Sequence, residues 1–375
     1  MSSYRIEAIT DYEELLRLKP EWDRLMAEAP VHHPFLSHEW MCTWWKHLGT
    51  GRQLHVLLAK ERDALRGIAP LQWTRKWMYG MRVRTLGFLY NPHTPRCDFI
   101  VARSAEEAYP ALWEHMRNGG PRWDALELPQ LPAGSRTLRI IQKLADSDGL
   151  LTGIWQGELS PYVPGQTWET YRDSLERGHR KNLSRRLKNL SKIGDVALEV
   201  VTSSEGLERA LEDVYRIEAA AWKGKAGTAI GDDPGIRRFY TSLAERTAKR
   251  GWLHLSFLTL NRRRISARYG LCHENRLYLL KSGYDPEFAK SSPASLHLSL
   301  LLQEAFSRGI AECDFLGGID EWKFKWTQAL RSHQWLYVFP RSSQGRFLHA
   351  VKFRIGPKMK RLHQRLNSHT THERA

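Results

Sequence analysis

The chain has 375 residues, a length that suits two domains or one large domain. Hydrophobic residues make up 42% of it and include 15 tryptophans, which excludes global disorder, collagen-like repeats and a disulfide-stapled miniprotein. The 57 lysines and arginines outnumber the 41 acidic residues, so the net charge is +16. Four widely separated cysteines, no apolar leader and no run of about 18 apolar residues predict a soluble cytoplasmic protein.

The first half of the sequence mixes helical and strand-like segments. A capping motif at residues 10–13 predicts a helix that Pro20 interrupts, and Ser37 is placed to cap a second helix. Two strand-like runs flank a polar turn at residues 61–63 and predict a hairpin. The elements expected next are a strand, a short strand, a helix, a strand and a helix, at residues 83–89, 97–101, 105–117, 125–128 and 135–146. Prolines and a glycine at residues 161–165 mark a boundary.

The second half has a similar order. A basic helix precedes a strand at residues 196–202, and two helices follow, the second of which begins at Asp233-Pro234. Three strands joined by tight turns then predict an antiparallel meander, at residues 252–260, 265–273 and 277–282. Residues 291–309 alternate like a strand at their centre, but caps at both ends favour a helix. With last strands at residues 313–316 and 335–339, the two halves look like diverged copies of one unit.

Two segments hold most of the excess positive charge. Residues 171–194 carry a net +6 and residues 341–375 a net +8. Clustered positive charge suits a polyanion such as tRNA, or an anionic membrane surface. Both segments also have apolar residues at helical spacing, so they equally fit helices docked on their own domain. These apolar residues are Leu183, Leu187 and Leu190 in the first segment and Phe347, Val351, Ile355, Met359, Leu362 and Leu366 in the second.

Several common functional motifs are absent. The sequence has no G-x-G-x-x-G, no P-loop and no G-x-S-x-G, so dinucleotide-binding, kinase-like and hydrolase functions lack support. His32, His33, His38 and Glu39 lie close together but lack a recognised ligand spacing. The sequence therefore predicts no metal site.

The second half carries motifs that resemble one family. They are Tyr278-Leu-Leu-Lys-Ser-Gly-Tyr-Asp285, Ser292-Pro293, Cys313-Asp-Phe-Leu-Gly-Gly318 and Trp322-Lys323-x-x-Trp326. Upstream segments agree with them, namely Pro34–Trp45, Gly67–Leu71, His179–Arg186 and Glu218-x-x-x-Trp222-Lys223. In this order the motifs resemble the CelD-type branch of the GNAT acyltransferase superfamily and the related Fem-type aminoacyltransferases, over most of residues 30–327. Two departures are Ala294 and Trp322, where the family has glycine and tyrosine.

The resemblance implies an α/β fold of two tandem GNAT-like domains, each with a mostly antiparallel central sheet flanked by helices. We expect a degenerate first domain at residues 1–165, an acyltransferase domain at residues 166–340 and a basic tail at residues 341–375. The implied enzyme is an N-acyltransferase that uses acyl-CoA, needs no metal and acylates an amine on a small molecule or peptide. Aminoacyl-tRNA, the donor of Fem-type enzymes, is an alternative. A catalytically silent GNAT-like module that binds RNA or a membrane is another.

The resemblance also implies the residues of the donor site. The strand at residues 277–282 is expected to present backbone groups to the donor carbonyl, and the helix start at residues 291–295 to bind its phosphates. The donor-binding candidates are therefore Leu280, Lys281, Ser282, Ser291, Ser292 and Ser295. The candidates for polyanion binding on the basic helix are Arg180, Lys181, Arg185 and Arg186.

Five further side chains are candidates for the chemistry. Lys323 is expected to bind a phosphate or the developing oxyanion, so Lys323→Ala should lower turnover far more than thermal stability. Tyr284, Asp285 and Glu218 are candidate proton acceptors or acceptor-binding groups. Asp314 fits either the site or a structural role in the turn that follows it. Large aromatic residues next to these, Trp222 and Trp326, are expected to form the core or the pocket wall.

Overall fold

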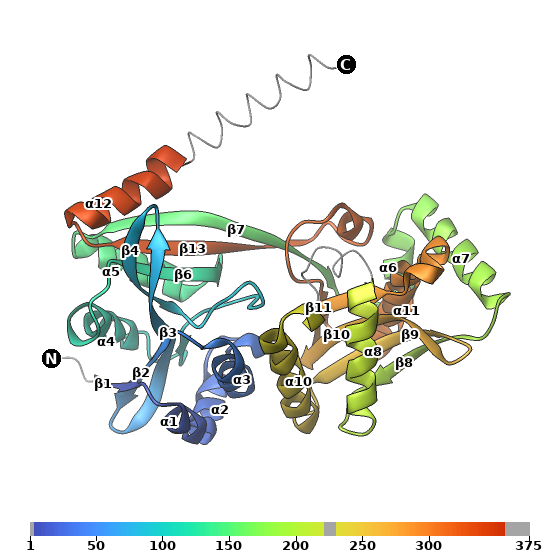
Figure 1. Ribbon diagram of the computed structural model, residues 1–375, viewed down its shortest axis with the longest axis horizontal. Coiled ribbons are helices and arrows are strands. Elements are labelled where there is room, and N and C mark those ends of the chain that lie inside the picture. The colour runs from blue at the N-terminus through green and yellow to red at the C-terminus, as the bar shows by residue number, and fades with distance from the viewer. Residues whose placement is uncertain (1–3, 221–229, 357–375) are drawn as a thin grey trace, which may run out of the picture. The chain divides into compact units, whose positions relative to one another are not determined.

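The computed structural model describes residues 4–220 and 230–356, which form two compact units (Figure 1). Unit 1 consists of the described parts of Met1–Val31, Gly49–Gly157 and His333–Ala375, and unit 2 of His32–Leu48 and Glu158–Ser332. We expect contiguous domains from the sequence, whereas these units interleave along the chain. In particular, residues 32–48 belong to unit 2 and residues 333–356 to unit 1.

Unit 1 is built on a mostly antiparallel sheet with the strand order β1-β2-β3-β4-β6-β13-β7, and β5 lies beside β3. The strands are β1 (Tyr4–Ile9), β2 (Gln53–Glu61), β3 (Ala64–Met78), β4 (Met81–Phe88), β5 (Ile100–Val101), β6 (Ala125–Pro132), β7 (Leu151–Pro164) and β13 (Leu330–Phe339). Neighbouring strands from β1 to β4 are antiparallel. The pair β4–β6 is parallel, and the pair β6–β13 is antiparallel. The predicted hairpin is thus confirmed as β2–β3.

The helical segments of unit 1 are α1 (Tyr12–Arg17), α2 (Lys19–Glu28), α4 (Ala108–Glu114), the π-helical turn η2 (His115–Gly119), α5 (Arg136–Ser147), α12 (Ser343–Ala350) and a second π-helical turn η6 (Val351–Ile355). The break predicted at Pro20 is confirmed, because α1 ends at Arg17 and α2 begins at Lys19, one residue before the proline. Asp11 caps α1 by accepting hydrogen bonds from Glu13 N and Glu14 N.

Unit 2 repeats the same strand pattern. The order is β7-β12-β11-β10-β9-β8, with the new strands β8 (Val196–Val201), β9 (Leu253–Leu260), β10 (Arg263–His273), β11 (Arg276–Tyr284) and β12 (Glu312–Asp314). The meander β9–β10–β11 is antiparallel as predicted, and β11 pairs in parallel with β12, as β4 does with β6 in unit 1. Each unit therefore contains one parallel strand pair inside a mostly antiparallel sheet.

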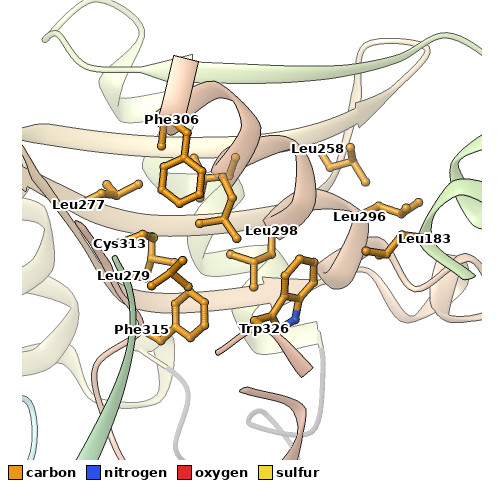
Figure 2. Close-up of a cluster of buried hydrophobic side chains, with 14 of the residues drawn as sticks. Leu183, Leu258, Leu277, Leu279, Leu296, Leu298, Phe306, Cys313, Phe315 and Trp326 are labelled. Atoms are coloured by element: carbon orange, nitrogen blue, oxygen red, sulfur yellow. The ribbon is translucent and has the colours of Figure 1, made fainter. Parts of the chain in front are cut away.

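The helices of unit 2 pack on this sheet. They are η1 (Pro34–Leu36), α3 (His38–Leu48), α6 (Trp168–Ser174), α7 (Arg177–Ser191), α8 (Leu207–Ala220), η3 (Ile230–Asp232), α10 (Pro234–Lys249), η4 (Pro286–Ser291), α11 (Pro293–Ser307) and η5 (Glu321–Lys325). Figure 2 shows the core cluster in which leucines of α11 meet side chains of β9, β11 and α7. The helix predicted for residues 291–309 is confirmed as α11. None of the described helices is long and apolar enough to cross a membrane.

The sequence failed to predict β1 and β7, and β7 contains the prolines that were interpreted as a boundary. Pro161 and Pro164 lie within this strand, because backbone groups around them still form hydrogen bonds with other segments. The carbonyl of Pro161 accepts a hydrogen bond from Phe315 N at 3.0 Å, and Tyr162 N donates to Ala329 O at 3.1 Å. A proline lacks only the N–H, so its carbonyl still joins the sheet.

The described part of the basic tail is a docked helix, one of the two alternatives that the sequence leaves open. Leu348 of α12 is fully buried in a cluster with Tyr337 and Phe339, whereas Phe347 is 46% exposed. The inward face therefore differs by one residue from the predicted stripe. The remaining tail residues, including Met359, Leu362 and Leu366, lie outside the described residues.

Candidate active site

A cavity of about 460 Å³ lies in unit 2 where β11 and β12 separate. The two strands pair in parallel over three residues, from Arg276 to Tyr278 on β11. β11 then continues beside β10 to Tyr284, whereas the chain after β12 follows β7. The cavity therefore occupies the divergence between these strands.

The cavity is lined by β10, β11, the start of α11 and the segment after β12. Its lining residues are Arg268, Leu279, Leu280, Lys281, Ser282, Gly283, Tyr284, Ala294, Ser295, Leu298, Phe315, Leu316, Gly317, Asp320, Trp322, Lys323 and Trp326. Four predicted donor-binding residues are among them, namely Leu280, Lys281, Ser282 and Ser295. The predicted wall residue Trp326 is also present and is buried. Ser291 and Ser292 do not line the cavity.

Ser292 instead forms the start of α11. Its backbone is left-handed, with φ 51° and ψ 57°, a conformation that residues other than glycine rarely adopt. The carbonyl of Ser292 accepts from Ser295 N at 3.0 Å and Leu296 N at 3.2 Å, and its hydroxyl is hydrogen-bonded to Arg186 of α7. This bond joins α7 to the start of α11. Arg186, predicted to bind a polyanion, thus has a partner within unit 2.

Lys323 lines the cavity, but its ammonium group is engaged by the chain itself. The side chain is 5% exposed, and Nζ donates to Leu316 O at 2.8 Å and to Gly318 O at 2.7 Å. Asp320 Oδ2 lies 3.2 Å from the same atom. An ammonium has three N–H donors, so all three are occupied. Lys323 therefore holds the segment 316–320 in place. This role differs from the direct contact with the donor that the sequence predicts.

The same segment contains a strained turn that Asp314 stabilises. Leu316 and Gly317 have φ of 52° and 60°, and the first of these is costly for a residue with a side chain. Asp314 is fully buried, and its Oδ1 accepts from Leu316 N at 2.9 Å, while Oδ2 lies 2.5 Å from Arg331 NH1. Asp314 does not line the cavity. Of its two predicted roles, the structure supports the structural one.

Of the three candidate proton acceptors, only Tyr284 lines the cavity. Asp285 caps η4 by accepting from Glu287 N at 3.1 Å and forms an ion pair with Arg263 at 2.8 Å. Glu218 of α8 is 1% exposed, and its Oε2 accepts from Ile230 N at 2.9 Å. The two carboxylates do not line the cavity, and backbone and ion-pair partners hold them.

A buried histidine fixes α11 to the strands below the cavity. His297 is fully buried, with Nδ1 3.1 Å from Ser266 Oγ and Nε2 3.0 Å from Ser256 Oγ. The hydroxyl of Ser266 donates to Gly283 O at 2.9 Å, so it must accept from Nδ1–H, and Ser256 then donates to Nε2. The ring is neutral in this arrangement. Burial, with the nearby charge of Arg268, lowers the pKa of His297 well below its ordinary value.

Sequence reasoning missed His297 and Arg268. Both interrupt otherwise apolar or small residues, His297 in the leucine-rich α11 and Arg268 in the middle of the buried strand β10. A polar residue at such a position needs a partner or a function. A polar residue within an otherwise apolar segment is therefore the sequence signal that could have identified His297 and Arg268.

The basic helix α7 has two faces. Leu183 and Leu190 are buried in the core of unit 2. Of the predicted polyanion-binding residues, Lys181 and Arg185 are exposed, and Arg180 forms an ion pair with Asp173 at 2.7 Å. The leucine stripe is therefore structural, while part of the basic face points to solvent.

Trp222 and Lys223 lie outside the described residues. Within residues 4–220 and 230–356, no group of three or more His, Cys, Asp or Glu side chains is placed to bind a metal ion.

The region that holds the cavity matches a known protein family. Residues 177–324, less than half of the chain, match the family model of an acetyltransferase (GNAT) domain. This region lies within unit 2 and includes nearly all of the cavity lining. No curated protein matches the sequence.

Solved structures share the fold over most of the chain. FemX is 15% identical, with a TM-score of 0.58 over 88% of this chain and 96% of that chain. The C-terminal domain assigned to a lysylphosphatidylglycerol synthetase from Agrobacterium fabrum is 10% identical, with a TM-score of 0.54 over 91% and 96%. A conserved protein of unknown function from Bacteroides thetaiotaomicron VPI-5482 is 9% identical, with a TM-score of 0.51 over 90% and 99%. These identities show likeness of fold alone.

The comparisons and the structure agree on the fold. Both units have a mostly antiparallel sheet flanked by helices, and the likeness to FemX extends over both. The cavity lies in the unit that matches the family model. Residues 177–324 therefore match a GNAT-type acetyltransferase domain, in a chain with a mixed α/β fold of two units.

Proposed function

We propose that this protein is an N-acyltransferase of the CelD-type branch, which transfers an acyl group from acyl-CoA to an amine. The cavity between β11 and β12 carries this proposal. It lies in the unit that holds the GNAT domain and is lined by both elements that the family resemblance assigns to the donor. These are residues 279–284 of β11 and the first turn of α11.

The reaction requires alignment more than bond activation, because a thioester is already a reactive donor. The amine nitrogen attacks the thioester carbonyl, the C–S bond breaks, and the thiolate leaves with the proton that the amine releases. Backbone groups of β11 beside the cavity are suited to the developing oxyanion, and the start of α11 to the phosphates of the donor. Tyr284 lines the cavity and is our candidate for passing the proton from the amine to the thiolate.

A second candidate donor is aminoacyl-tRNA, which one feature of unit 2 favours. Lys181 and Arg185 are exposed on α7, and the same helix is bonded to the start of α11 through Arg186 and Ser292. A polyanion bound to α7 would thus reach the helix start beside the cavity. Fem-type aminoacyltransferases, which this sequence also resembles, use that donor.

Salt dependence separates the two donors. Each phosphate neutralised by the protein releases counterions, so log affinity for tRNA should fall against log salt concentration with a slope of about −0.7 to −0.9 per contact. Acetyl-CoA carries few phosphates and should show a much shallower slope. Titration calorimetry with acetyl-CoA and with charged tRNA between about 50 and 200 mM salt measures both. We expect the shallow acetyl-CoA behaviour, together with acylated amine detected by mass spectrometry.

Charge reversal on α7 provides the matched test. Lys181→Glu with Arg185→Glu should leave acetyl-CoA binding within twofold of wild type but weaken a tRNA donor strongly. Lys249→Glu, an exposed position on α10, is the control for a change in overall charge. Strong loss of tRNA binding with aminoacyl transfer would favour the Fem-type alternative. Absence of product with either donor would favour the silent RNA- or membrane-binding module.

A further inference from the structure

Arg268 is a buried cation that has no acidic partner in the described part of the chain. It lies on β10, lines the cavity and is 4% exposed. One guanidinium nitrogen, NH2, donates to Ala294 O in the first turn of α11 at 3.0 Å. Its Nε is buried without an acceptor. Among the described residues, no aspartate or glutamate lies within ion-pair distance of it.

Other arginines of unit 2 show what the chain provides elsewhere. Arg263 pairs with Asp285 and Glu287, and Arg264 is hydrogen-bonded to Glu199 and Asp213. Arg331 likewise pairs with two carboxylates, Glu312 and Asp314. Each of these three is more exposed than Arg268, yet each has two acidic partners. The most buried of the four arginines has none.

The missing partner has an energetic consequence. Removing a charged group from water costs several kcal/mol unless an opposite charge compensates. Burial lowers the pKa of Arg268 to about 10, which leaves the guanidinium charged at neutral pH. Asp320, the one acidic residue among the described residues that line the cavity, lies 3.2 Å from Lys323 Nζ. The described lining therefore carries more positive than negative charge.

We propose that Arg268 binds an anionic group of the acyl donor, so that the ligand provides the counter-charge that the described residues do not. A guanidinium presents parallel N–H groups that match the paired oxygens of a carboxylate or a phosphate. This inference rests on the proposed function, because it takes the cavity to be the donor site. It goes beyond that function by assigning Arg268 and by requiring an anion inside the cavity.

Two parts of a CoA thioester have this chemistry. One is the phosphate portion, which Arg268 would meet beneath the first turn of α11. The other is a carboxylate at the end of the acyl group, as in a dicarboxylic acyl-CoA. Calorimetric titration of acetyl-CoA and succinyl-CoA into wild type and Arg268→Met distinguishes them. Equal loss of affinity for both compounds assigns the phosphates, and loss confined to succinyl-CoA assigns the acyl carboxylate. We expect at least a tenfold loss in one of these patterns.

Arg268→Lys and Arg264→Met are the comparison variants. The lysine keeps the charge but loses the paired N–H groups, so it should recover part of the affinity. In the absence of ligand, Arg268→Met should unfold at the same temperature as wild type or a higher one, because an apolar side chain replaces an uncompensated charge. Arg264→Met should unfold at a lower temperature, since it removes a charged partner from both Glu199 and Asp213.

Small anions test the site independently of the donor. Pyrophosphate and succinate should raise the unfolding temperature of wild type but not of Arg268→Met. If they do so while no CoA thioester binds, the anion site stands and the proposed donor is wrong. The inference is overturned if Arg268→Met binds both thioesters like wild type. It is also overturned if the variant unfolds like Arg264→Met and small anions stabilise neither protein, because Arg268 would then be structural.

Discussion

At the scale of single residues, the polar groups around the cavity divide into those that hold the chain and those that face the cavity. Lys323 and Asp314 together fix the turn at Leu316 and Gly317, one through carbonyls and the other through a backbone N–H. Ser282, Tyr284 and Arg268 line the cavity. One motif therefore contains residues that stabilise the chain and residues that line the cavity. Their spacing in the sequence does not tell the two kinds apart.

Lys323→Ala should reduce both stability and donor binding. The substitution leaves the carbonyls of Leu316 and Gly318 without the ammonium, and a buried group that loses its partner costs about 1–3 kcal/mol. The segment that lines the cavity would then lose its fixed position. Thermal unfolding and acetyl-CoA titration measure the two effects.

Lys325→Ala is the matched control, because Lys325 is exposed two residues away in the same helical turn. It should change the free energy of unfolding by less than about 0.5 kcal/mol. A Lys323→Ala protein with wild-type stability and sharply reduced turnover would instead support direct contact with the donor.

At the scale of elements, α11 depends on the neutral state of His297. Its pKa in the folded protein lies well below the unfolded value, so this residue stabilises the fold fully above about pH 6.5. As the pH falls below that, the unfolded chain binds the proton first and stability is lost. At pH 5.5 this loss amounts to about 1.4 kcal/mol relative to pH 7.5.

His297→Gln should reduce that dependence, since an amide bonds to serines without gaining a proton. Urea denaturation at pH 7.5 and pH 5.5 measures the difference for both proteins. Other histidines contribute equally to the two, so the comparison isolates His297. An unchanged pH dependence in the variant would contradict the assignment of a neutral ring.

Most elements could be predicted because their signals are local. Asp233 followed by Pro234 marks the start of α10, and the turns at residues 261–262 and 274–275 separate the strands of the meander. β7 could not be predicted, because its prolines resemble a boundary and its partner strands are distant in sequence. The inward face of α12 was missed for a related reason, since Phe347 and Leu348 are both apolar and only the docked surface selects between them.

The site was predictable where a motif lies on one element. Leu280, Lys281 and Ser282 line the cavity together because β11 carries them as consecutive residues. Arg268 and His297 were not found, since their roles depend on contacts between β10 and α11. Asp285 and Glu218 do not line the cavity, and the sequence did not reveal their contacts with Arg263 and Ile230. Pairing between elements is the information that a single sequence lacks.

At the scale of the whole molecule, the two units have separate cores, and a variant can test whether they respond separately. Leu348→Ala creates a cavity in the core cluster of unit 1, which should cost about 2–5 kcal/mol. All the described residues that line the cavity belong to unit 2, so affinity for the proposed donor should be unchanged at temperatures where the variant is folded. Calorimetric unfolding and titration measure both quantities.

The neighbouring substitution Phe347→Ala serves as the control for that experiment. Phe347 is 46% exposed, and its removal should cost well under the value for Leu348. Equal destabilisation by the two variants would mean that both side chains are packed. A loss of acetyl-CoA affinity in Leu348→Ala alone would show that unit 1 influences the donor site.

The pairing of β6 with β13 has a consequence for the order of events during synthesis. Leu128 and Leu336 face each other in that pair. The sheet of unit 1 can therefore be completed only after a strand roughly 200 residues later in the sequence has been synthesised. At about 5–20 residues per second the delay is roughly 10–40 s, during which β6 has an open edge that can pair with other chains. Unit 2 needs no residue beyond Ser332. The nascent chain therefore holds every residue of the segment that matches the GNAT domain before it can complete the unit where the sequence begins.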